Sequence, residues 1–343
     1  MHIDNESMTE VTISTFTPGG LSVVIPNYNG RELLEANLPA LYQALKLAAV
    51  SFEIIVPDDA STDDSISFLK ANFPDITIVE NNINRGFAPN INSGIFLAKY
   101  DLVFLMNSDV KLVGDYFTSQ LQYFAKASTF GVMGRIIGYD NEEIQDAAKT
   151  QYKHGLKIGA NVNLVPTNPL QLWFPTLYLS GANALVHREK LMMLQGFDEA
   201  YAPFYGEDLD LCMRAWKVGW HSYYHHAAVC RHPNSVTIKK YNKKKKIQII
   251  VYRNRFIMHA IHLSGLQLIR WNVWIRLQLL FKTLLFKTEF ATAFFQFLKY
   301  KTQIQNARKA LQKLGFKTGT LHSNDEVYSQ VLAAQLHVGY RKV

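Results

Sequence analysis

Strand and helix signals alternate through about the first third of the chain, and this alternation constrains the fold more than any other feature. Apolar runs at 21–25, 52–56, 76–79 and 102–106 predict buried strands. The segments between them predict helices at 32–50, 61–73 and 89–99, the second starting at a capping-box pattern of Ser61 and Asp64. Strands that alternate with helices at this spacing form right-handed βαβ units, so we expect an α/β fold with a mostly parallel central sheet.

A polar cluster follows each expected strand. The four clusters are Asn27-Tyr28-Asn29-Gly30, Asp58-Asp59, the stretch 81–86 and Asn107-Ser108-Asp109. The carboxyl ends of parallel strands meet at one edge of the sheet, where open α/β sheets bind their ligands. Four clusters in succession favour a nucleotide-type ligand over chance polar loops. Neither G-x-G-x-x-G nor G-x-x-x-x-G-K-[ST] occurs, which argues against a dinucleotide fold and a P-loop.

The two aspartates after the second expected strand have two interpretations. Asp58 is expected to accept hydrogen bonds from a nucleobase or a ribose. The alternative for both Asp58 and Asp59 is a turn followed by a helix cap, and we prefer that alternative for Asp59.

An acidic cluster opens a helical segment farther along the chain. Glu207, Asp208 and Asp210 follow a turn-forming glycine, and apolar residues recur behind them at helical spacing. Crowded carboxylates in a helix that otherwise reads as buried are costly unless they have a chemical task. The alternative is a surface cap, because acids favour the first turn of a helix. Asp208 or Glu207 is our candidate general base, and Asp210 is expected to pair with Arg214 one turn on.

A candidate metal site involves Asp109. An aspartate at a strand end offers the hard oxygen ligand that Mg²⁺ or Mn²⁺ prefers, and a substrate diphosphate would complete the coordination shell. His232 lies near His225 and His226 in the sequence. It is either a further metal ligand or phosphate contact, or an ordinary structural histidine.

The net charge of +8 hides an asymmetry along the chain. Residues 231–343 carry 21 Lys and Arg against 3 Asp and Glu, whereas residues 1–230 carry 15 against 25. This distribution indicates metal chemistry in the first part and an anionic surface or ligand for the second. Cys212 and Cys230 offer neither a disulfide framework nor zinc spacing, and residues 1–18 lack a signal-peptide pattern. We therefore expect a cytoplasmic protein.

The last hundred or so residues are expected to be basic and helical. Lysines at 239, 240 and 243–246 precede a helical region at 247–314, in which Trp, Phe and Leu recur at three- and four-residue steps among Arg and Lys. No uncharged helical run reaches the ~20 residues that span a bilayer. We favour an interfacial helix on an anionic membrane over a helix pair packed on the catalytic domain or on a second subunit. No nucleic-acid-binding motif accompanies the lysines.

The stretch 158–187 contains no Asp, Glu, Lys or Arg. Three prolines interrupt it, so it does not read as a membrane span. We expect irregular structure that leads to a buried strand near 177–179.

Seven short motifs resemble, in sequence and order, those of the family 2 glycosyltransferases with the GT-A fold. They are VVIPNYNG (23–30), DDASTD (58–63), NRGFAPNINSG (84–94), NSD (107–109), SGAN (180–183), GFDE (196–199) and EDLD (207–210). The similarity covers Leu21 to about Ser235 and is greatest to the bacterial rhamnosyltransferase-like branch of cell-surface polysaccharide synthesis. It is thin in the C-terminal segment.

The resemblance implies inverting transfer of a sugar from a nucleotide-diphosphate donor to a hydroxyl, assisted by a divalent cation, Mg²⁺ or Mn²⁺. It implies that Asp208 is the catalytic base with Glu207 beside it. Asp109 is then the metal-binding end of a D-x-D-type motif, and we add His232 as a further metal ligand. The expected nucleotide-sugar-binding residues are Pro26, Asn27, Tyr28, Asp58, Asn84, Gly86, Phe87, Asn107 and Gly181.

These expectations divide the chain into a polar tail (1–18), a GT-A catalytic domain (19–237) and a basic helical region (238–343). The expected role is bacterial cell-surface polysaccharide or glycolipid synthesis, with a glycan or polyprenyl-diphosphate-linked acceptor and peripheral contact with the inner face of the cytoplasmic membrane. A homo-oligomer is compatible with this reading, and no nucleic-acid partner is expected. The alternatives are a catalytically silent sugar-nucleotide-binding or assembly protein and a metal-dependent nucleotide-sugar hydrolase, which would need a second carboxylate positioned to work with water or as a nucleophile.

Overall fold

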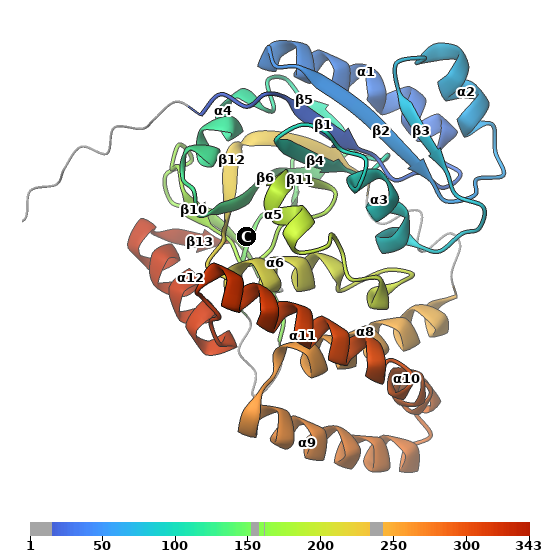
Figure 1. Cartoon of the computed structure of the whole chain (residues 1–343), viewed down its shortest axis with the longest axis vertical. Helices are drawn as coiled ribbons and strands as arrows, with labels where there is room; N and C mark the ends of the chain where they lie inside the picture. The colour runs from blue at the N-terminus through green and yellow to red at the C-terminus, as the bar shows by residue number, and fades with distance from the viewer. Residues whose placement is uncertain (1–15, 152–157, 161, 234–242) are drawn as a thin grey trace, which may run out of the picture.

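The computed structural model of the chain describes residues 16–151, 158–160, 162–233 and 243–343 (Figure 1). Most of the expected N-terminal tail, the lysines at 239 and 240, and the expected domain boundary after residue 237 lie outside these residues. The core is a mixed sheet of ten strands, in the order β10-β12-β6-β11-β4-β1-β2-β3, with β5 beside β12 and β7 beside β6. The strands are β1 (Leu21–Val24), β2 (Phe52–Asp58), β3 (Thr77–Glu80), β4 (Leu102–Met106), β5 (Lys111–Val113), β6 (Thr129–Gly138), β7 (Ile144–Asp146), β10 (Phe174–Pro175), β11 (Asn183–His187) and β12 (His221–His232).

Strands β1 to β4 form the expected parallel unit. Leu21 pairs with Phe52 on one side and with Leu102 on the other, and β3 adds to β2 in the same direction. The helices between these strands are α1 (Arg31–Ala48), α2 (Ser65–Asn72) and α3 (Phe87–Ile95). The predicted alternation of strands and helices is therefore confirmed, with small shifts at the ends of the elements.

Alternate residues of the strands build two separate cores, one on each face of the sheet. Val23, Ile54 and Phe104 pack with the apolar residues of α1 and α2. Their neighbours Val24 and Ile55 pack on the other face with α3 and with the helices that follow β11. A side chain points to opposite faces at successive strand positions, so a run of uninterrupted apolar residues is what a sheet covered on both faces requires.

Helix α2 begins four residues later than the capping-box pattern predicts. Ser61 does not cap it, because its backbone N–H and its hydroxyl both donate hydrogen bonds to Asp58, at 2.8 and 2.6 Å. The side chain of Asp63 instead accepts hydrogen bonds from the backbone N–H and the hydroxyl of Ser65, the first residue of the helix. The apparent start signal at Ser61 belongs to the preceding loop.

The remaining part of the sheet is mixed. Strand β11 runs antiparallel between β4 and β6, and β12 runs parallel to β6. The expected strand near 177–179 is wrong: Leu177 donates its N–H to Lys149 from an irregular segment, and the flanking strands are β10 and β11. Short helices α4 (Thr118–Leu121), η1 (Gln122–Ala125), α5 (Arg188–Met193) and η2 (Glu199–Tyr201) and the longer α6 (Glu207–Lys217) complete this part.

Between residues 243 and 343 the structure describes five helices: α8 (Lys244–His262), α9 (Gly265–Leu284), α10 (Thr288–Leu298), α11 (Lys301–Thr318) and α12 (Asn324–Val338). A small second sheet of β8 (Ala148–Thr150), β9 (Val162–Pro166) and β13 (Tyr340–Lys342) has the order β13-β9-β8. The side chain of Gln335 in α12 donates to the carbonyls of Lys149 and Pro175. The end of the chain therefore packs against the part that bears the large sheet. None of the helices that the structure describes is long and apolar enough to cross a membrane.

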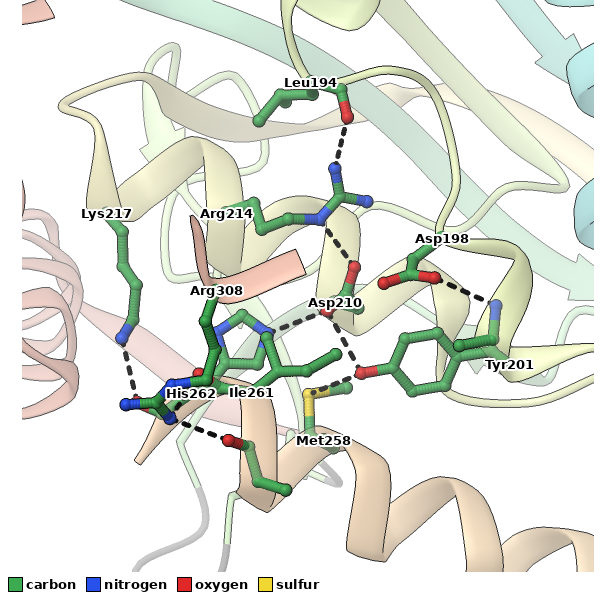
Figure 2. A network of polar contacts seen from close by, with 12 residues as sticks. Leu194, Asp198, Tyr201, Asp210, Arg214, Lys217, Met258, Ile261, His262 and Arg308 are labelled. Carbon is green, nitrogen blue, oxygen red and sulfur yellow. Dashed lines mark hydrogen bonds and ion pairs between the residues drawn. The ribbon is translucent and has the colours of Figure 1, made fainter. Parts of the chain in front are cut away.

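A buried polar network joins α6 to the C-terminal helices (Figure 2). Asp210 of α6 pairs with Arg214 at 2.6 Å, as the sequence predicted, and also contacts His262 of α8 at 2.8 Å. The hydroxyl of Tyr201 donates to the same carboxylate at 3.1 Å. Lys217 donates to the carbonyl of His262, so both ends of α6 are fixed to the end of α8. Arg308 of α11 adds hydrogen bonds to carbonyls in that same last turn of α8.

Candidate functional site

A cavity of about 670 Å³ lies at the carboxyl ends of the parallel strands. Its wall contains residues that follow β1, β2 and β4, together with the start of α6, the end of β7 and the first turn of α8. Of the expected nucleotide-sugar-binding residues, the cavity is lined by Pro26, Asn27, Tyr28, Asn84, Gly86, Phe87, Asn107 and Gly181. The expected catalytic and metal-binding residues Asp208, Glu207, Asp109 and His232 line the same cavity.

Asp58 is the exception among these expected residues. It is buried behind the cavity wall, and its carboxylate accepts hydrogen bonds from the side chain of Asn27 at 2.7 Å and from Ser61. Its position fits a structural tie between the ends of β1 and β2, which is the turn-forming alternative, better than a contact with a nucleobase.

Asp59, which we expected to be a turn or cap residue, lines the cavity instead. Its carboxylate accepts the backbone N–H groups of Arg85 at 2.9 Å and Gly86 at 2.8 Å. Burial raises the pKa of Asp59 despite these two hydrogen bonds. Asp59 therefore holds the loop that leads into α3 at the edge of the cavity. This is a structural role at a turn, as the preferred alternative expected, although Asp59 does not cap α2.

Gly86 is required by two features of this loop. Its φ of +90° lies in the region that favours glycine, and a Cβ at this position would lie 2.5 Å from Cα of Pro203. The next residue, Phe87, donates its N–H to the carbonyl of Pro203 at 2.9 Å. The loop and the segment before α6 are thus in direct backbone contact across the cavity wall.

Replacement of Gly86 by alanine is expected to destabilise the protein by about 1–3 kcal/mol or more, because the left-handed backbone and the contact with Pro203 both resist a side chain. Urea unfolding monitored by circular dichroism measures the change. Gly114→Ala is the matched control, since Gly114 has a φ of +60° but nothing within 4 Å of the new Cβ. An equal decrease in the free energy of unfolding in both variants would mean that the close contact with Pro203 does not contribute to the effect.

The acidic pair at the start of α6 is buried and electrostatically unusual. Burial, followed by the charge of the neighbouring Asp208, raises the pKa of Glu207 to about 8. Burial also raises the pKa of Asp208 to about 7, although the backbone of Gly181 and the hydroxyl of Tyr178 partly oppose the shift. Tyr178 donates to Asp208 Oδ2 at 3.3 Å, and Glu207 Oε2 is buried without a hydrogen-bond partner among the described residues. A carboxyl with a pKa near 7 is suited to accept a proton at neutral pH.

Gly181 leaves the space that this pair needs. A Cβ at Gly181 would lie 2.6 Å from Asp208 Oδ1 and 3.3 Å from the ring of Phe87. The glycine thus keeps open the region where the carboxylate and the loop before α3 approach each other.

Asp109 and His232 lie together on another part of the wall. Asp109 Oδ1 is 3.3 Å from His232 Nε2, and the other ring nitrogen of His232 contacts Gln145 Oε1 at 3.4 Å. Asn107 Oδ1 is buried and has no hydrogen-bond partner among the described residues. A carboxylate, an imidazole and an unused amide oxygen are a donor set that fits Mg²⁺ or Mn²⁺, with the rest of the shell left to a substrate diphosphate and water.

The pair is not a complete metal cage. Within the described ranges no group of three or more His, Cys, Asp and Glu residues could hold an ion. His225 and His226, the neighbours of His232 in sequence, are buried elsewhere and contact Tyr123 and Tyr224. Burial lowers the pKa of both, to about 4 for His226. The histidine cluster in the sequence is therefore not a cluster in space.

The cavity is strongly acidic. Five carboxylates line it: Asp59, Asp109, Asp146, Glu207 and Asp208. Among the lining residues that the structure describes, Lys246 in the first turn of α8 is the single Lys or Arg. Asp146 pairs with Lys149 at 2.8 Å, and burial raises the pKa of Asp146. An anionic ligand in this cavity needs positive charge from a cation and from Lys246.

Sequence reasoning did not single out Asp146, Tyr178 or Lys246 for this site. Asp146 ends a three-residue strand, and Tyr178 lies in the irregular segment after β10. Lys246 was read as part of a basic run. The other site residues were found because a polar cluster follows each expected strand. No such cluster surrounds these three positions.

The fold and the cavity define a GT-A-type α/β protein with an acidic ligand site at the carboxyl edge of its sheet. The sequence profile of the family described as Glycosyl transferase family 2 matches residues 22–194, slightly more than half of the chain. The chain belongs to this family. The rhamnosyltransferase-like branch stays a prediction.

Curated relatives match a shorter part. Proteins of Yersinia pestis (strain Pestoides F) and Yersinia pseudotuberculosis serotype I (strain IP32953), both named undecaprenyl-phosphate 4-deoxy-4-formamido-L-arabinose transferase, are 35% identical to this chain over 95 residues. The aligned part is 26% of this chain and 29% of each relative.

Solved structures are similar in fold. GalNAc-T7, crystallised with UDP, GalNAc and Mn²⁺, superposes with a TM-score of 0.57 at 15% identity, covering 71% of this chain and 48% of that chain. S. aureus TarS 1–349 in complex with UDP gives a TM-score of 0.50 at 14% identity, covering 72% of this chain and 67% of that chain. At these identities the similarity concerns the fold, and it agrees with the predicted GT-A architecture.

Proposed function

We propose that this protein is an inverting, metal-dependent glycosyltransferase that moves a sugar from a nucleotide-diphosphate donor to a hydroxyl acceptor. One arrangement carries the proposal. Asp208 and Glu207, whose pKa values burial raises, line the same cavity as Asp109 and His232, which form a suitable cation-binding pair. A base for the acceptor and a cation for the diphosphate are the two groups that inverting transfer requires.

In the proposed reaction, the oxygen of the acceptor hydroxyl attacks the anomeric carbon while Asp208 takes the hydroxyl proton. The bond between the anomeric carbon and the diphosphate oxygen breaks on the opposite side, and the nucleoside diphosphate leaves with the electron pair. Asp109 and His232 would hold the divalent cation, which neutralises charge on that leaving group when bound. Lys246 adds a second positive charge at the cavity.

The nature of the acceptor is a further part of the proposal. The name of the Yersinia relatives contains undecaprenyl phosphate, which supports a lipid-linked glycan that reacts through a sugar hydroxyl, and a role in cell-envelope synthesis, for this chain as well. A glycan acceptor without a lipid is compatible with the same chemistry, because the base needs only a hydroxyl. The structural relatives crystallised with UDP make uridine diphosphate sugars the first donors to test.

The direct test is a panel of uridine, guanosine and thymidine diphosphate sugars, each with and without Mn²⁺. We expect one donor class to raise the melting temperature only when the metal is present, because a ligand that binds the folded state at 100 times its Kd adds about 2.7 kcal/mol of stability. Asp109→Asn is expected to abolish the metal-dependent part of the shift. A shift of equal size in EDTA would contradict the metal requirement.

Product analysis separates transfer from its alternatives. A transferase releases nucleoside diphosphate only when an acceptor is supplied. Release without any acceptor would indicate a hydrolase, and donor binding without release under any condition would indicate a silent binding protein. Mass spectrometry of the acceptor identifies the transferred sugar.

A further inference from the structure

Helix α9 carries two apolar stripes, of which one is buried. Trp271 and Ile275 face inward and pack, with the half-buried Leu268 and Leu279, against the cluster formed by α8 and α10. Burial of this inner stripe holds α9 against the rest of the protein. It leaves unexplained the apolar residues on the opposite side.

The outer stripe consists of six residues at three- and four-residue steps, each 54–69% exposed: Leu266, Ile269, Val273, Leu277, Leu280 and Leu284. It continues into the turn after α9, where Leu285 is 52% and Phe286 is 89% exposed. Single exposed apolar residues are ordinary, whereas a contiguous row along a whole helix marks an interaction surface. In Figure 1, α9 lies at the lower end of the molecule, opposite α1, with its long side toward solvent.

The charges on α9 are all positive. Residues 265–288 contain Arg270, Arg276, Lys282 and Lys287 and no Asp or Glu. Lys282 points inward, over the rings of Tyr252 and Phe290. Arg270 and Arg276 are exposed beside the outer stripe, and within the described part of the chain neither forms an ion pair with an acid.

We propose that the outer stripe of α9 inserts into the surface of an anionic membrane, with Arg270 and Arg276 beside the lipid phosphates. The combination of an exposed apolar row and flanking arginines matches a helix that lies in the interface, because the apolar side chains enter the acyl boundary while the long cationic side chains reach the headgroups. A second copy of this chain is a poorer occupant. A second α9 would add only positive charge, because residues 265–288 contain no carboxylate to pair with Arg270 and Arg276.

The position of α9 connects this surface to the cavity. Just after α9, Glu289 at the start of α10 pairs with Lys245 of α8 at 3.4 Å, and the adjacent Lys246 lines the cavity. The end of α9 is therefore connected through one ion pair to the turn of α8 that contributes Lys246 to the cavity wall. The docking itself rests on the exposed face of α9 and not on the proposed transfer reaction.

Co-sedimentation with vesicles tests the proposal. The full chain is expected to bind vesicles of phosphatidylglycerol and phosphatidylcholine, and to bind pure phosphatidylcholine much less. The double variant Leu277→Glu and Leu280→Glu is expected to lower the partition coefficient by about tenfold or more, since two apolar anchors are lost and two negative charges face the lipid. Phe316→Glu is the matched control: Phe316 is 92% exposed, belongs to α11 and not to the stripe, and its replacement should leave binding unchanged.

The contribution of the two arginines to membrane binding can be measured separately. Arg270→Gln with Arg276→Gln should weaken binding to anionic vesicles several-fold, and higher salt should weaken binding of the unmodified protein in the same way. All substituted positions are exposed, so circular dichroism melting should show a folded protein in each case. Unchanged sedimentation of the double glutamate variant would overturn the proposal. So would a protein that ignores vesicles and forms a dimer that Leu277→Glu and Leu280→Glu dissolve, since α9 would then be a subunit interface.

Discussion

Replacement of Asp208 by asparagine is expected to reduce sugar transfer by about 100- to 10,000-fold while donor binding changes little. Asparagine has nearly the same shape as aspartate but cannot accept the hydroxyl proton. The Mn²⁺-dependent thermal shift with the donor should persist, because the variant leaves Asp109 and His232 in place. Steady-state rates and the thermal shift, measured on the same preparation, make the comparison. Transfer at a near wild-type rate would show that Asp208 is not the base.

The pH profile gives an independent check of the same carboxyl. Burial raises the pKa of Asp208 to about 7 and that of Glu207 to about 8, so the pair loses its protons around neutral pH and above. A base must be ionised to act, and the rate should therefore fall as the pH drops through this range. Glu207 has the higher pKa and is still protonated where Asp208 ionises, so Glu207→Gln should leave the acidic limb nearly in place. A large shift of the limb to lower pH in this variant would show that Glu207 ionises before Asp208 does.

Replacement of Asp210 by alanine is expected to lower the free energy of unfolding by about 3–5 kcal/mol. The change leaves Arg214 as an unpaired charge in the interior and removes the shared partner of His262 and Tyr201 (Figure 2). Urea unfolding measures the loss. Glu35→Gln is the matched control, because Arg31 and Glu35 form an ion pair with the same four-residue spacing on the surface of α1. That exposed pair should be worth no more than about 0.5 kcal/mol.

The pH dependence of this pair has a definite sign. Burial disfavours the charged form of Asp210, but Arg214 and His262 outweigh it and hold the pKa at about 2. An aspartate whose folded pKa is lowered contributes stability that is complete above its unfolded pKa of about 4 and is lost as the pH falls toward 2. The difference in the free energy of unfolding between the unmodified protein and Asp210→Ala should therefore decrease as the pH falls from about 4 toward 2. A difference that stays constant would mean that the charge of the Asp210 carboxylate does not stabilise the packing of α6 against α8.

The parallel half of the fold and much of the site could be predicted because local signals determine them. Apolar runs of strand length, each followed by a polar cluster, specify both the strands and the edge where their loops meet. Asp58 and Asp59 show the limit of this reasoning. Adjacent residues at the end of a strand point in different directions, and their hydrogen-bond partners decide which of them reaches the cavity. Asp58 is bound by Ser61 and Asn27 behind the wall. Asp59 is bound by the backbone of Arg85 at the cavity.

Other parts depend on contacts that no local pattern records. His225, His226 and His232 are close in sequence, but β12 is an extended strand with an irregularity between His225 and Val229, so its residues face different surroundings. Helix α9 carries two apolar stripes in one segment, so its sequence shows no single amphipathic face. Only the positions of α8 and α10 show which stripe is covered.

The small sheet has a consequence for the order in which the molecule assembles. β9 receives its partner β13 from a part of the chain that is synthesised well over a hundred residues later, and Gln335 anchors Lys149 from the same late segment. Lys149 in turn pairs with Asp146 on the cavity wall. While the ribosome is still making the C-terminal helices, the first strands can already associate, but this wall lacks its support. We therefore expect this part of the cavity wall to become ordered only after α12 has docked.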